Sequence, residues 1–339
     1  MIVAKFGGTC VTAANVKKIA KLVGDDCGAV VVSAVGKSFS GDVKTTDALV
    51  SLHGNLPCVD GFSVVEEKYR ALYSAMGLPF PQEETEETLQ NILTKNHLDY
   101  TVGCGEQLAA KAVSRYLSLP YAEADELFFF DENGIDKGKT YAAIRAAHKR
   151  FGRFVTGGFY GSKDGVRKLF PRGGSDVSGA LVAAALSASL YENWTDVCGF
   201  CIADPRLVPD VSSVRCLCYD DAELLARAGA SVLHPDAIEP CREAGVAICV
   251  RNVYDEFDAG TLISSANSPG QLLGVVERAE NGKFFTTVVH TLDRAFVAEA
   301  VSRAVRNSSA KMLSLRAEKN SVVLQTDLSL ARQICSLLQ

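Results

Sequence analysis

The sequence contains no long hydrophobic run and no cluster of basic residues. No stretch approaches the roughly 18 apolar residues that span a bilayer, and the longest apolar tract, 180–190, is rich in alanine and serine. The formal net charge is -5. A mildly acidic chain without a lysine–arginine run gives no electrostatic reason to expect a nucleic acid or an anionic membrane as partner. We therefore expect neither.

A secretion signal and a disulfide framework are also missing. Lys5 and two glycines interrupt the first apolar stretch, so no signal-peptide core forms there. The 11 cysteines are odd in number and scattered through apolar runs, which favours reduced thiols in a cytoplasmic protein. Cys198 and Cys201 have C-x-x-C spacing, but neither a second pair nor a histidine pair accompanies them. We interpret them as small core side chains rather than as metal or redox sites.

Strand-length apolar runs alternate with helical patterns through residues 1–263, which predicts an α/β domain around a mostly parallel sheet. The total of 339 residues exceeds the usual size of one domain, so two domains are expected. The small, polar segment 264–270 fits a linker. Beyond it, the order strand, strand, helix, strand, strand, helix predicts a small α+β domain over 270–339, with two helices on one face of a four-stranded antiparallel sheet.

Within the first domain the pattern predicts strands and helices at definite places. The strands are expected at 2–6, 29–33, 154–156, 194–197 and 247–252. The helices are expected at 15–23, 66–76, 83–95, 106–117, 140–151, 175–190 and 220–228.

Two glycine-rich segments carry the most chemistry. In Lys5-Phe6-Gly7-Gly8-Thr9, at a strand end before a helix, the glycines let backbone N–H groups approach a phosphate. The helix N-terminus would favour the same anion, and Lys5 would neutralise charge on a transferring phosphoryl group. A plain tight turn is the alternative. The pattern is not a Walker A loop, whose G-x-x-x-x-G-K-[ST] sequence is absent.

The second glycine-rich segment is Pro171-Arg172-Gly173-Gly174-Ser175-Asp176. We expect Ser175 to be the N-cap of the helix that follows. Arg172 could bind a carboxylate through two parallel hydrogen bonds, and Asp176 could orient Lys5 or a metal-bound water. The alternative is an ordinary helix cap beside a surface charge.

Two further segments are weaker signals. Thr195 and Asp196 at a strand end, followed by the Asp204-Pro205-Arg206 turn, could hold ribose and phosphates, although a lone Asp-Pro pair is usually just a turn. Glu106, at the expected start of a helix, could receive a substrate ammonium. A glutamate that the helix dipole favours there is the alternative.

Taken together, these segments resemble the aspartokinase family in type and in order. They are KFGGTC, SAVG with TTDAL, GEQLA, TGGFYG, PRGGSD, WTDV, DPR, GASVLHP and GTLI, and they cover residues 1 to about 263. The resemblance implies an amino-acid-kinase-like three-layer sandwich followed by one ACT-like domain. It implies Mg²⁺-dependent transfer of phosphate from ATP to the side-chain carboxylate of L-aspartate, giving 4-phospho-L-aspartate.

The resemblance also implies roles for the matching residues. Lys5 and Asp176 would be catalytic. Thr46, Glu106, Arg172, Gly173, Gly174 and Ser175 would bind the amino acid. The residues on the nucleotide side would be Lys5, Phe6, Gly7, Gly8, Thr195, Asp196, Cys201, Arg206 and Ser231. No metal-ligating residue is assigned. Because aspartate's side chain is already ionised at neutral pH, the reaction needs no general base, and a Ser–His–Asp constellation is not expected.

Some positions depart from the family pattern. Ser231 stands where the family has a lysine, Cys201 replaces a tyrosine, and Cys10 and Ala109 replace serines. These changes affect mainly the nucleotide side, so we predict weaker nucleotide affinity than in a typical member. The inserted segment 37–44 could alter access to the amino-acid pocket. The short C-terminal part has room for one ACT-like unit, whose exposed sheet edge or helix face predicts a homodimer.

Two other functions are consistent with these residues. The chain could be a weakly active or inactive family member that binds an amino acid as a sensor or partner subunit, an alternative that the loss of a lysine at Ser231 supports. It could also phosphorylate another acidic amino acid, as an N-acetylglutamate-type kinase does. Glu106 speaks against an acylated substrate, because an acylated amine has no positive charge to pair.

Overall fold

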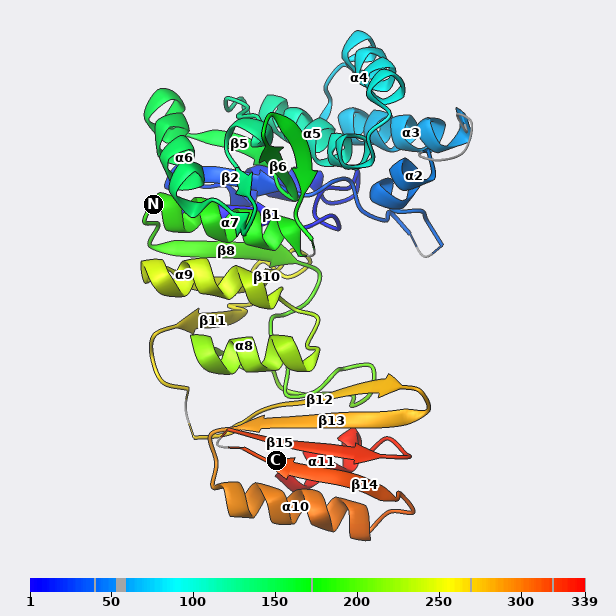
Figure 1. Ribbon diagram of the computed structural model, residues 1–339, viewed down its shortest axis with the longest axis vertical. Coiled ribbons are helices and arrows are strands. Elements are labelled where there is room, and N and C mark those ends of the chain that lie inside the picture. Colours follow the sequence, from blue (N-terminus) through cyan, green and yellow to red (C-terminus); the bar gives the residue numbers. More distant parts are fainter. Residues whose placement is uncertain (40, 53–58, 172, 269, 319, 339) are drawn as a thin grey trace. The chain divides into compact units, whose positions relative to one another are not determined.

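The structure is a computed structural model (Figure 1) that describes residues 1–39, 41–52, 59–171, 173–268, 270–318 and 320–338. The chain folds into two compact units. The first contains residues 1–196 and 239–248, and the second contains residues 197–238 and 249–339. These units divide the chain differently from the expected domains 1–263 and 270–339, whose limits stay a prediction.

Four parallel strands form the sheet of the first unit, in the order β5-β2-β1-β8. They are β1 (Ile2–Phe6), β2 (Cys27–Val32), β5 (Phe154–Gly157) and β8 (Leu190–Thr195). Every residue of β2 is buried, as expected for a valine-rich strand covered on both faces. Phe6, Val32 and Trp194 lie in register, so the carboxyl ends of these three strands meet at one edge of the sheet.

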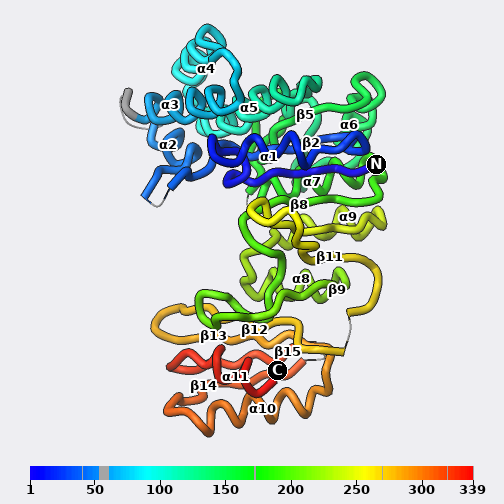
Figure 2. The backbone as a smooth tube through the Cα atoms, turned by 180° about the vertical axis from the view of Figure 1, so that it is seen from behind, coloured from blue at the N-terminus to red at the C-terminus, as the bar shows by residue number. Residues whose placement is uncertain are grey.

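Helices cover both faces of this sheet. The helix α7 (Gly174–Ala185) packs on β1, β2 and β8, and α6 (Lys137–Phe151) packs on α7. The helix α5 (Leu98–Leu117) packs on β5 and β2. The helix α1 (Val16–Leu22) lies on the side that faces the viewer in Figure 2.

Three more helices and two hairpins complete the first unit. The helices α2 (Thr45–Ser51), α3 (Val59–Met76) and α4 (Gln82–Lys95) pack with α5. One hairpin joins β3 (Phe130–Asp131) to β4 (Gly134–Ile135), and the other joins β6 (Tyr160–Lys163) to β7 (Val166–Leu169). A 3-10 turn, η1 (Ala124–Glu126), follows α5.

The second unit begins with a small parallel pair of strands, β9 (Cys216–Cys218) and β11 (Thr261–Ser264). The helix α8 (Tyr219–Ala228) and the 3-10 turn η2 (Pro235–Ala237) lie between them in sequence. The helix α9 (Ile238–Ala244) and the strand β10 (Ala247–Asn252) are the segments at which the chain passes between the two units.

A four-stranded antiparallel sheet in the order β12-β13-β15-β14 occupies the C-terminal part of the second unit. Its elements are β12 (Leu272–Glu280), β13 (Lys283–His290), α10 (Arg294–Arg306), β14 (Met312–Ala317), β15 (Ser321–Thr326) and α11 (Ala331–Leu338). The two helices pack on each other and share one core with the inward side chains of the sheet, including Val288, Val301 and Ile334.

The strand β14 differs from its neighbours because all six of its residues are exposed. It pairs with β15 on one side and ends the strand order on the other. Met312, Leu313 and Leu315 are 48%, 42% and 37% exposed, respectively. The small domain therefore carries an edge strand with apolar side chains in contact with solvent.

The expected α/β domain around a mostly parallel sheet and the small α+β unit are confirmed, but several element boundaries were wrong. The helix expected at 66–76 begins at Val59. The helix expected at 106–117 begins at Leu98. The helix expected at 175–190 ends at Ala185, and β8 starts at Leu190 rather than at 194. Among the described residues, no helix has both the length and the apolar character needed to cross a membrane.

Candidate active site

Lys5 and Asp176 meet at the carboxyl edge of the parallel sheet. The Lys5 ammonium lies 2.6 Å from Asp176 Oδ1 and donates at 3.2 Å to Asn193 Oδ1. Asn193 Nδ2 in turn donates to Asp176 Oδ1 at 3.1 Å. The strands explain this meeting, because Lys5 on β1 stands in register with Asn193 on β8. Sequence reasoning predicted Lys5 and Asp176 but missed Asn193.

Both groups of this ion pair are largely shielded from solvent. The exposed fractions of the Lys5 and Asp176 side chains are 7% and 18%. Charges in such a place interact far more strongly than charges in water. The structure therefore brings together the two residues that were predicted to be catalytic.

The glycine loop after β1 is held tightly by its neighbours. The Gly7 N–H donates to Trp194 O at 3.0 Å, and the Gly36 N–H donates to Gly8 O at 2.9 Å. A Cβ on Gly8 would lie 3.2 Å from Ala34 O. Because the Gly7 N–H is occupied, Gly8 is the glycine of the pair whose N–H can meet a phosphate oxygen. The helix α1 begins at Val16, within one residue of the start expected from the sequence.

Ser175 does not cap α7, contrary to the sequence prediction. The cap position belongs to Gly173, which has a left-handed φ of 59° and makes no side-chain cap bond. That backbone conformation favours glycine. The Ser175 hydroxyl instead accepts a 2.8 Å hydrogen bond from the Ser33 hydroxyl at the end of β2. A Cβ on Gly158 would lie 2.6 Å from Ser175 Cβ, so the helix start is pressed against the TGGFYG segment.

Glu106 lies in the middle of α5, so its expected place at a helix start was wrong. The residue is 4% exposed, and its Oε2 atom has no hydrogen-bond partner among the described residues. Burial raises the pKa of the Glu106 carboxyl to about 8, although the backbone N–H of Ala34 and the charge of Arg167 act in the opposite direction. At neutral pH the Glu106 carboxyl is therefore mostly neutral, and a nearby ammonium would favour its ionised form.

The helix α2 contributes two neighbouring threonines with different roles. The Thr45 hydroxyl is fully buried and donates to Val35 O at 2.7 Å. Thr46, the residue predicted to contact the amino acid, is half-buried in the same helical turn. Arg172, predicted to bind the α-carboxylate, lies outside the described residues. Gly174, two residues further on, is so closely packed that a Cβ would lie 2.5 Å from a ring carbon of Phe159.

The end of β8 provides the other predicted nucleotide residues of the first unit. The Thr195 hydroxyl donates to Asp196 Oδ1 at 3.2 Å. Trp194, just before them, accepts from the glycine loop through its carbonyl oxygen and stacks on Phe6 with ring centroids 6.3 Å apart. Because the Phe6 side chain is fully buried, a nucleotide could contact only its backbone.

The remaining predicted nucleotide residues belong to the second unit, and two of the three, Arg206 and Ser231, are exposed. The Arg206 side chain is 86% exposed and pairs with Asp204 at 2.6 Å. Ser231 is exposed, and its hydroxyl donates at 3.4 Å to Gly229 O. Cys201 is half-buried and forms an antiparallel bridge with Ser213.

Arg167, on β7, is a buried cation that sequence reasoning missed. Its side chain is 3% exposed and lies 2.7 Å from Asp125 Oδ2 and 3.6 Å from Glu123 Oε1. The guanidinium is sandwiched between Tyr100 and Tyr160, at 4.7 and 4.2 Å from the ring centroids. Its partners are distant in sequence, so no local pattern could have revealed this site.

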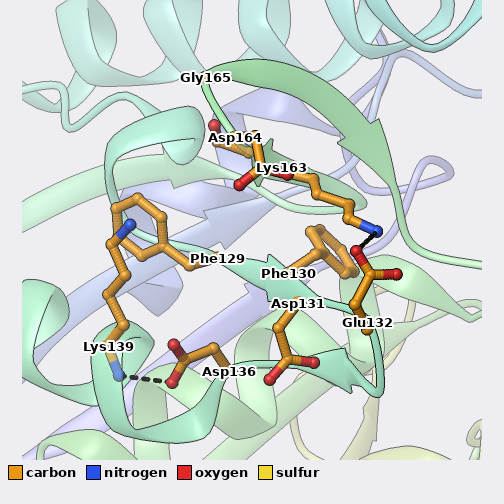
Figure 3. Close-up of a pocket in the computed structure, with 10 residues that line it drawn as sticks. Phe129, Phe130, Asp131, Glu132, Asp136, Lys139, Lys163, Asp164 and Gly165 are labelled. Carbon is orange, nitrogen blue, oxygen red and sulfur yellow. Dashed lines mark hydrogen bonds and ion pairs between the residues drawn. The ribbon is translucent and has the colours of Figure 1, made fainter.

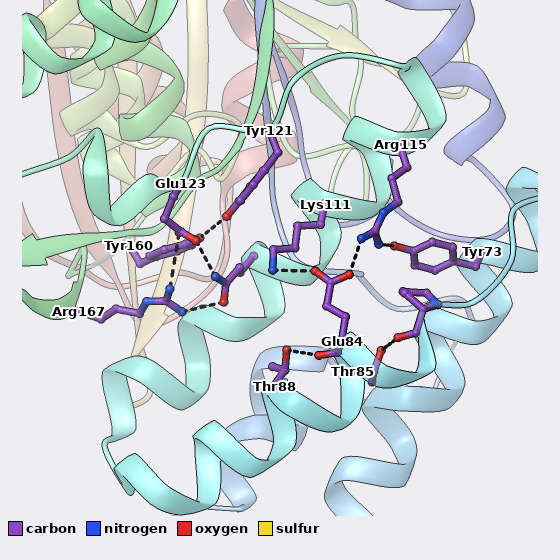
Figure 4. A network of polar contacts seen from close by, with 12 residues as sticks. Tyr73, Glu84, Thr85, Thr88, Lys111, Arg115, Tyr121, Glu123, Tyr160 and Arg167 are labelled. Atoms are coloured by element: carbon purple, nitrogen blue, oxygen red, sulfur yellow. Dashed lines mark hydrogen bonds and ion pairs between the residues drawn. The ribbon is translucent and has the colours of Figure 1, made fainter. Parts of the chain in front are cut away.

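The Arg167 network (Figure 4) includes Gln107, the residue that follows Glu106 on α5. Gln107 donates to Glu123 at 2.6 Å, and the Tyr160 hydroxyl donates to the same carboxylate at 2.7 Å. A Cβ on Gly103 would lie 2.9 Å from Arg167 Cδ. The network thus fixes the residues on both sides of Glu106.

A pocket of about 500 Å³ lies between the two hairpins of the first unit (Figure 3). Phe129 and Phe130 line it together with charged side chains, among which Lys163 pairs with Glu132 at 3.0 Å. Lys139 covers the ring of Phe129, with its ammonium 4.0 Å from the centroid. None of the predicted site residues lines this pocket.

The buried cysteines behave as core side chains. Burial raises the pKa of the Cys10 and Cys104 thiols to about 11, so few thiolates exist at neutral pH. Cys10 donates to Trp194 O at 3.3 Å, behind the glycine loop. Among the described residues, all cysteines are free.

Comparisons with known proteins agree with this geometry. Residues 1–252 match the model of the amino acid kinase family. Aspartokinase 3 of Bacillus subtilis (strain 168) is 30% identical over 305 residues, covering 81% of this chain and 66% of that protein. Aspartokinase 1, chloroplastic, of Arabidopsis thaliana is 29% identical over 295 residues, covering 77% of this chain and 52% of that protein. The chain thus spans from about half to just under two thirds of the length of these relatives.

Solved structures show the same fold. The aspartate kinase of Clostridium acetobutylicum superposes with a TM-score of 0.89 and 24% identity, covering 100% of both chains. Aspartokinase III of E. coli, in complex with aspartate and ADP, superposes with a TM-score of 0.74 and 23% identity, covering 98% of this chain and 80% of that one. The resemblance to aspartokinases that the sequence motifs indicated is confirmed.

Proposed function

The chain belongs to the amino acid kinase family, and on that premise we propose that it phosphorylates the side-chain carboxylate of L-aspartate with ATP. The observation that carries the proposal is the shielded ion pair between Lys5 and Asp176 beside the glycine loop. Such a pair holds an ammonium in a fixed place at a sheet edge where a phosphoryl group can approach it. The products would be 4-phospho-L-aspartate and ADP.

The main barrier to this reaction is repulsion between two anions. At about 4 Å, two unit charges repel by roughly 4 kcal/mol at an effective dielectric near 20. A carboxylate oxygen of aspartate forms a bond to the γ-phosphorus, while the bond from that phosphorus to the bridging oxygen breaks and the electron pair leaves with ADP. Lys5 would neutralise the phosphoryl oxygens, and the Gly8 N–H would donate to them. Asp176 and Asn193 would hold the Lys5 ammonium in position.

The amino acid would be held by groups that recognise its charged backbone. The Oε2 atom of Glu106, which has no partner among the described residues, would receive the α-ammonium, and Thr46 on α2 would contact the same substrate. Arg172 would bind the α-carboxylate, and Gly173, Gly174 and Ser175 would line the site at the start of α7. The pairing with Glu106 favours a free amino acid over an acylated one.

The nucleotide would contact the backbone of Phe6, Gly7 and Gly8, the Thr195–Asp196 pair and Arg206. Cys201 and Ser231 would stand at positions where relatives carry bulkier or charged side chains. Mg²⁺ would enter with ATP and offset phosphate charge. The described residues contain no cluster of three or more potential ligands, so the proposal assigns most of the coordination to phosphate oxygens and water.

A second function is favoured by one observation on the nucleotide side. Ser231 is exposed and supplies no charge at the position where the family pattern has a lysine. An amino-acid sensor or partner subunit with weak or absent turnover would tolerate this loss. A kinase for another acidic amino acid is the third possibility, and Glu106 restricts it to substrates with a free ammonium.

One experiment separates these functions. Purified protein is incubated with Mg-ATP and a panel containing aspartate, glutamate and N-acetylglutamate, and ADP release is followed together with hydroxylamine trapping of the acyl phosphate. Of the three acids, we expect only aspartate to give ADP and hydroxamate, in equal amounts. Calorimetric binding of aspartate without turnover would support the sensor, and turnover with another acid would identify the other kinase.

We also propose that the C-terminal unit is ACT-like and joins two copies of the chain. Two helices on one face of a four-stranded sheet support the first part, and the exposed apolar edge of β14 supports the second. Light scattering at micromolar concentration should give a dimer mass, which Leu315→Lys should reduce. A monomer of the unmodified protein would contradict the proposal. A cytoplasmic location is proposed too, because the described cysteines are all free.

A further inference from the structure

The segment Ser33–Gly36, which follows β2, touches both sides of the candidate active site. The Ser33 hydroxyl donates to Ser175 at 2.8 Å, the Ala34 N–H favours the ionised form of Glu106, and Val35 O accepts from Thr45. The Gly36 N–H donates to Gly8 O at 2.9 Å. Different residues of this segment thus contact the glycine loop and the residues predicted to bind the amino acid.

Gly36 is the residue of this segment that lies against the glycine loop. A Cβ on Gly36 would lie 2.5 Å from the carbonyl carbon of Gly8, closer than two unbonded carbons can approach. The two backbones are thus in direct contact, with no side chain between them. A small displacement of Gly36 must displace Gly8 as well.

Lys68, in the middle of α3, binds the carbonyl oxygen of Gly36. Its ammonium donates at 3.2 Å to Gly36 O and lies 2.5 Å from Asp42 Oδ2. The exposed fractions of the Lys68 and Asp42 side chains are only 8% and 12%. Asp42 also accepts from the Ser38 N–H at 2.7 Å. Both backbone polar groups of Gly36 are therefore engaged, the N–H by the glycine loop and the carbonyl oxygen by a shielded cation.

We propose that Lys68 is a positioning residue for the nucleotide, and that it acts through Gly36 on Gly8. The inference rests on the proposed kinase function, since it assumes that Gly8 meets the phosphates. The ion pair with Asp42 keeps the Lys68 ammonium directed at Gly36 O. Residues 34 and 35 keep partners of their own, Glu106 for Ala34 and Thr45 and Tyr69 for Val35, so losing Lys68 should affect the nucleotide more than the amino acid.

The test compares Lys68→Met with Lys68→Arg and with a matched control on the same helix. Arg70→Met also removes an ion-paired cation from α3, but the Arg70 side chain is 49% exposed and pairs with Glu66 one turn earlier. We expect Lys68→Met to raise the KM for Mg-ATP about 10- to 100-fold, the usual size of effects from misplaced supporting groups. The KM for aspartate should stay within about threefold of the unmodified value.

Lys68→Arg should restore most of the ATP affinity, because a guanidinium can reach the same two acceptors. Arg70→Met should leave both KM values unchanged. A loss of stability alone would lower the active fraction without separating the two KM values. Equal changes for ATP and aspartate, or no change for either, would therefore overturn the proposal.

A second measurement does not depend on turnover. Hydrogen–deuterium exchange of the Gly36 amide reports its bond to Gly8 O. We expect about 10- to 100-fold faster exchange in Lys68→Met, with amides of α7 and β8 unchanged. If the unmodified protein makes no acyl phosphate, the kinase proposal fails while this measurement still tests Lys68. Unchanged exchange at Gly36 would refute the positioning role even in an active kinase.

Asp42→Asn provides the same test if Lys68→Met does not fold. It removes the negative charge that directs the ammonium and keeps a side chain of the same shape. We expect a smaller change in the same direction, about threefold or more in the KM for ATP, with faster Gly36 exchange. A variant that folds and shows neither change would contradict the proposal.

Discussion

The charged residues predicted for the site differ in exposure between the two units. In the first unit, Lys5 and Glu106 are nearly enclosed, at 6% and 4% exposure, and each lies in a scaffold of neighbouring strands and helices. In the second unit, the Arg206 side chain is 86% exposed and pairs with a carboxylate two residues away. Lys5 and Glu106 are held by surrounding strands and helices, whereas Arg206 is held only by a solvent-exposed pair with Asp204.

This difference indicates where binding and catalysis depend on geometry. Preorganised charges in a shielded place stabilise a transition state without further rearrangement. Exposed charges contribute less, because water and salt screen them. We expect changes in the first unit to remove activity or stability outright, and changes in the second unit to adjust nucleotide affinity by small factors.

The largest effect is expected from Lys5→Met. Removing the ammonium takes away the cation that would neutralise the phosphoryl oxygens, so kcat should fall about 10³-fold, as when a preorganised donor is lost. Hydroxamate formation at saturating substrates measures this change. Lys21→Met, on the exposed side of α1, removes an equal charge and should keep full activity. A Lys5 variant within tenfold of the unmodified kcat would rule out the proposed role.

A pair of arginines extends the comparison to stability. Arg167→Met removes the buried cation that pairs with Asp125 and Glu123, which should lower the free energy of unfolding by about 3 kcal/mol. Arg206→Met breaks an exposed pair and should leave the melting temperature unchanged. Thermal unfolding followed by circular dichroism compares the two variants directly. Equal shifts would mean that the enclosure of Arg167 contributes no stability.

Glu106 gives the next largest effect, and it depends on pH. With a pKa raised to about 8, the carboxyl must lose a proton before it can pair with an ammonium. Below pH 8, the affinity for aspartate should therefore rise about tenfold for each unit of increasing pH. Glu106→Gln should raise the KM for aspartate about 100-fold and remove this dependence. Calorimetry between pH 6 and 9 tests both expectations.

The Glu106 control uses the nucleotide. The KM for ATP should change little in Glu106→Gln, because Glu106 makes none of the hydrogen bonds that hold the glycine loop. An aspartate affinity that stays flat with pH in the unmodified protein would show that Glu106 is already ionised or does not meet the substrate.

Several features of the molecule could be predicted from the sequence because their signals are local. Apolar β-branched runs such as 29–33 correctly indicated strands that are covered on both faces. The ordered glycine motifs indicated Lys5 and Asp176, which lie 2.6 Å apart in the structure. These conclusions depend on residue types within a few positions and on their order along the chain.

Other features depend on tertiary packing and could not be read locally. A helix was expected to start at Glu106, but α5 begins at Leu98 and contains Gly105. A Cβ on Gly105 would lie 3.1 Å from Ala34 Cβ, so tertiary packing explains a glycine inside this helix better than local propensity does. Ser175 looked like a cap, yet the left-handed Gly173 takes that position. Asn193 was missed because only the pairing of β8 with β1 brings it to Lys5.

The smallest expected effect belongs to the second unit. Ser231→Lys restores a cation at an exposed position, and a screened charge of this kind contributes about 1 kcal/mol, so the KM for ATP should fall about fivefold. Ser265→Lys adds the same charge elsewhere on the exposed surface of this unit and should have no effect. The gain should shrink as salt is raised, because the interaction is screened. An unchanged or higher KM for ATP in Ser231→Lys would show that the missing lysine does not weaken nucleotide binding.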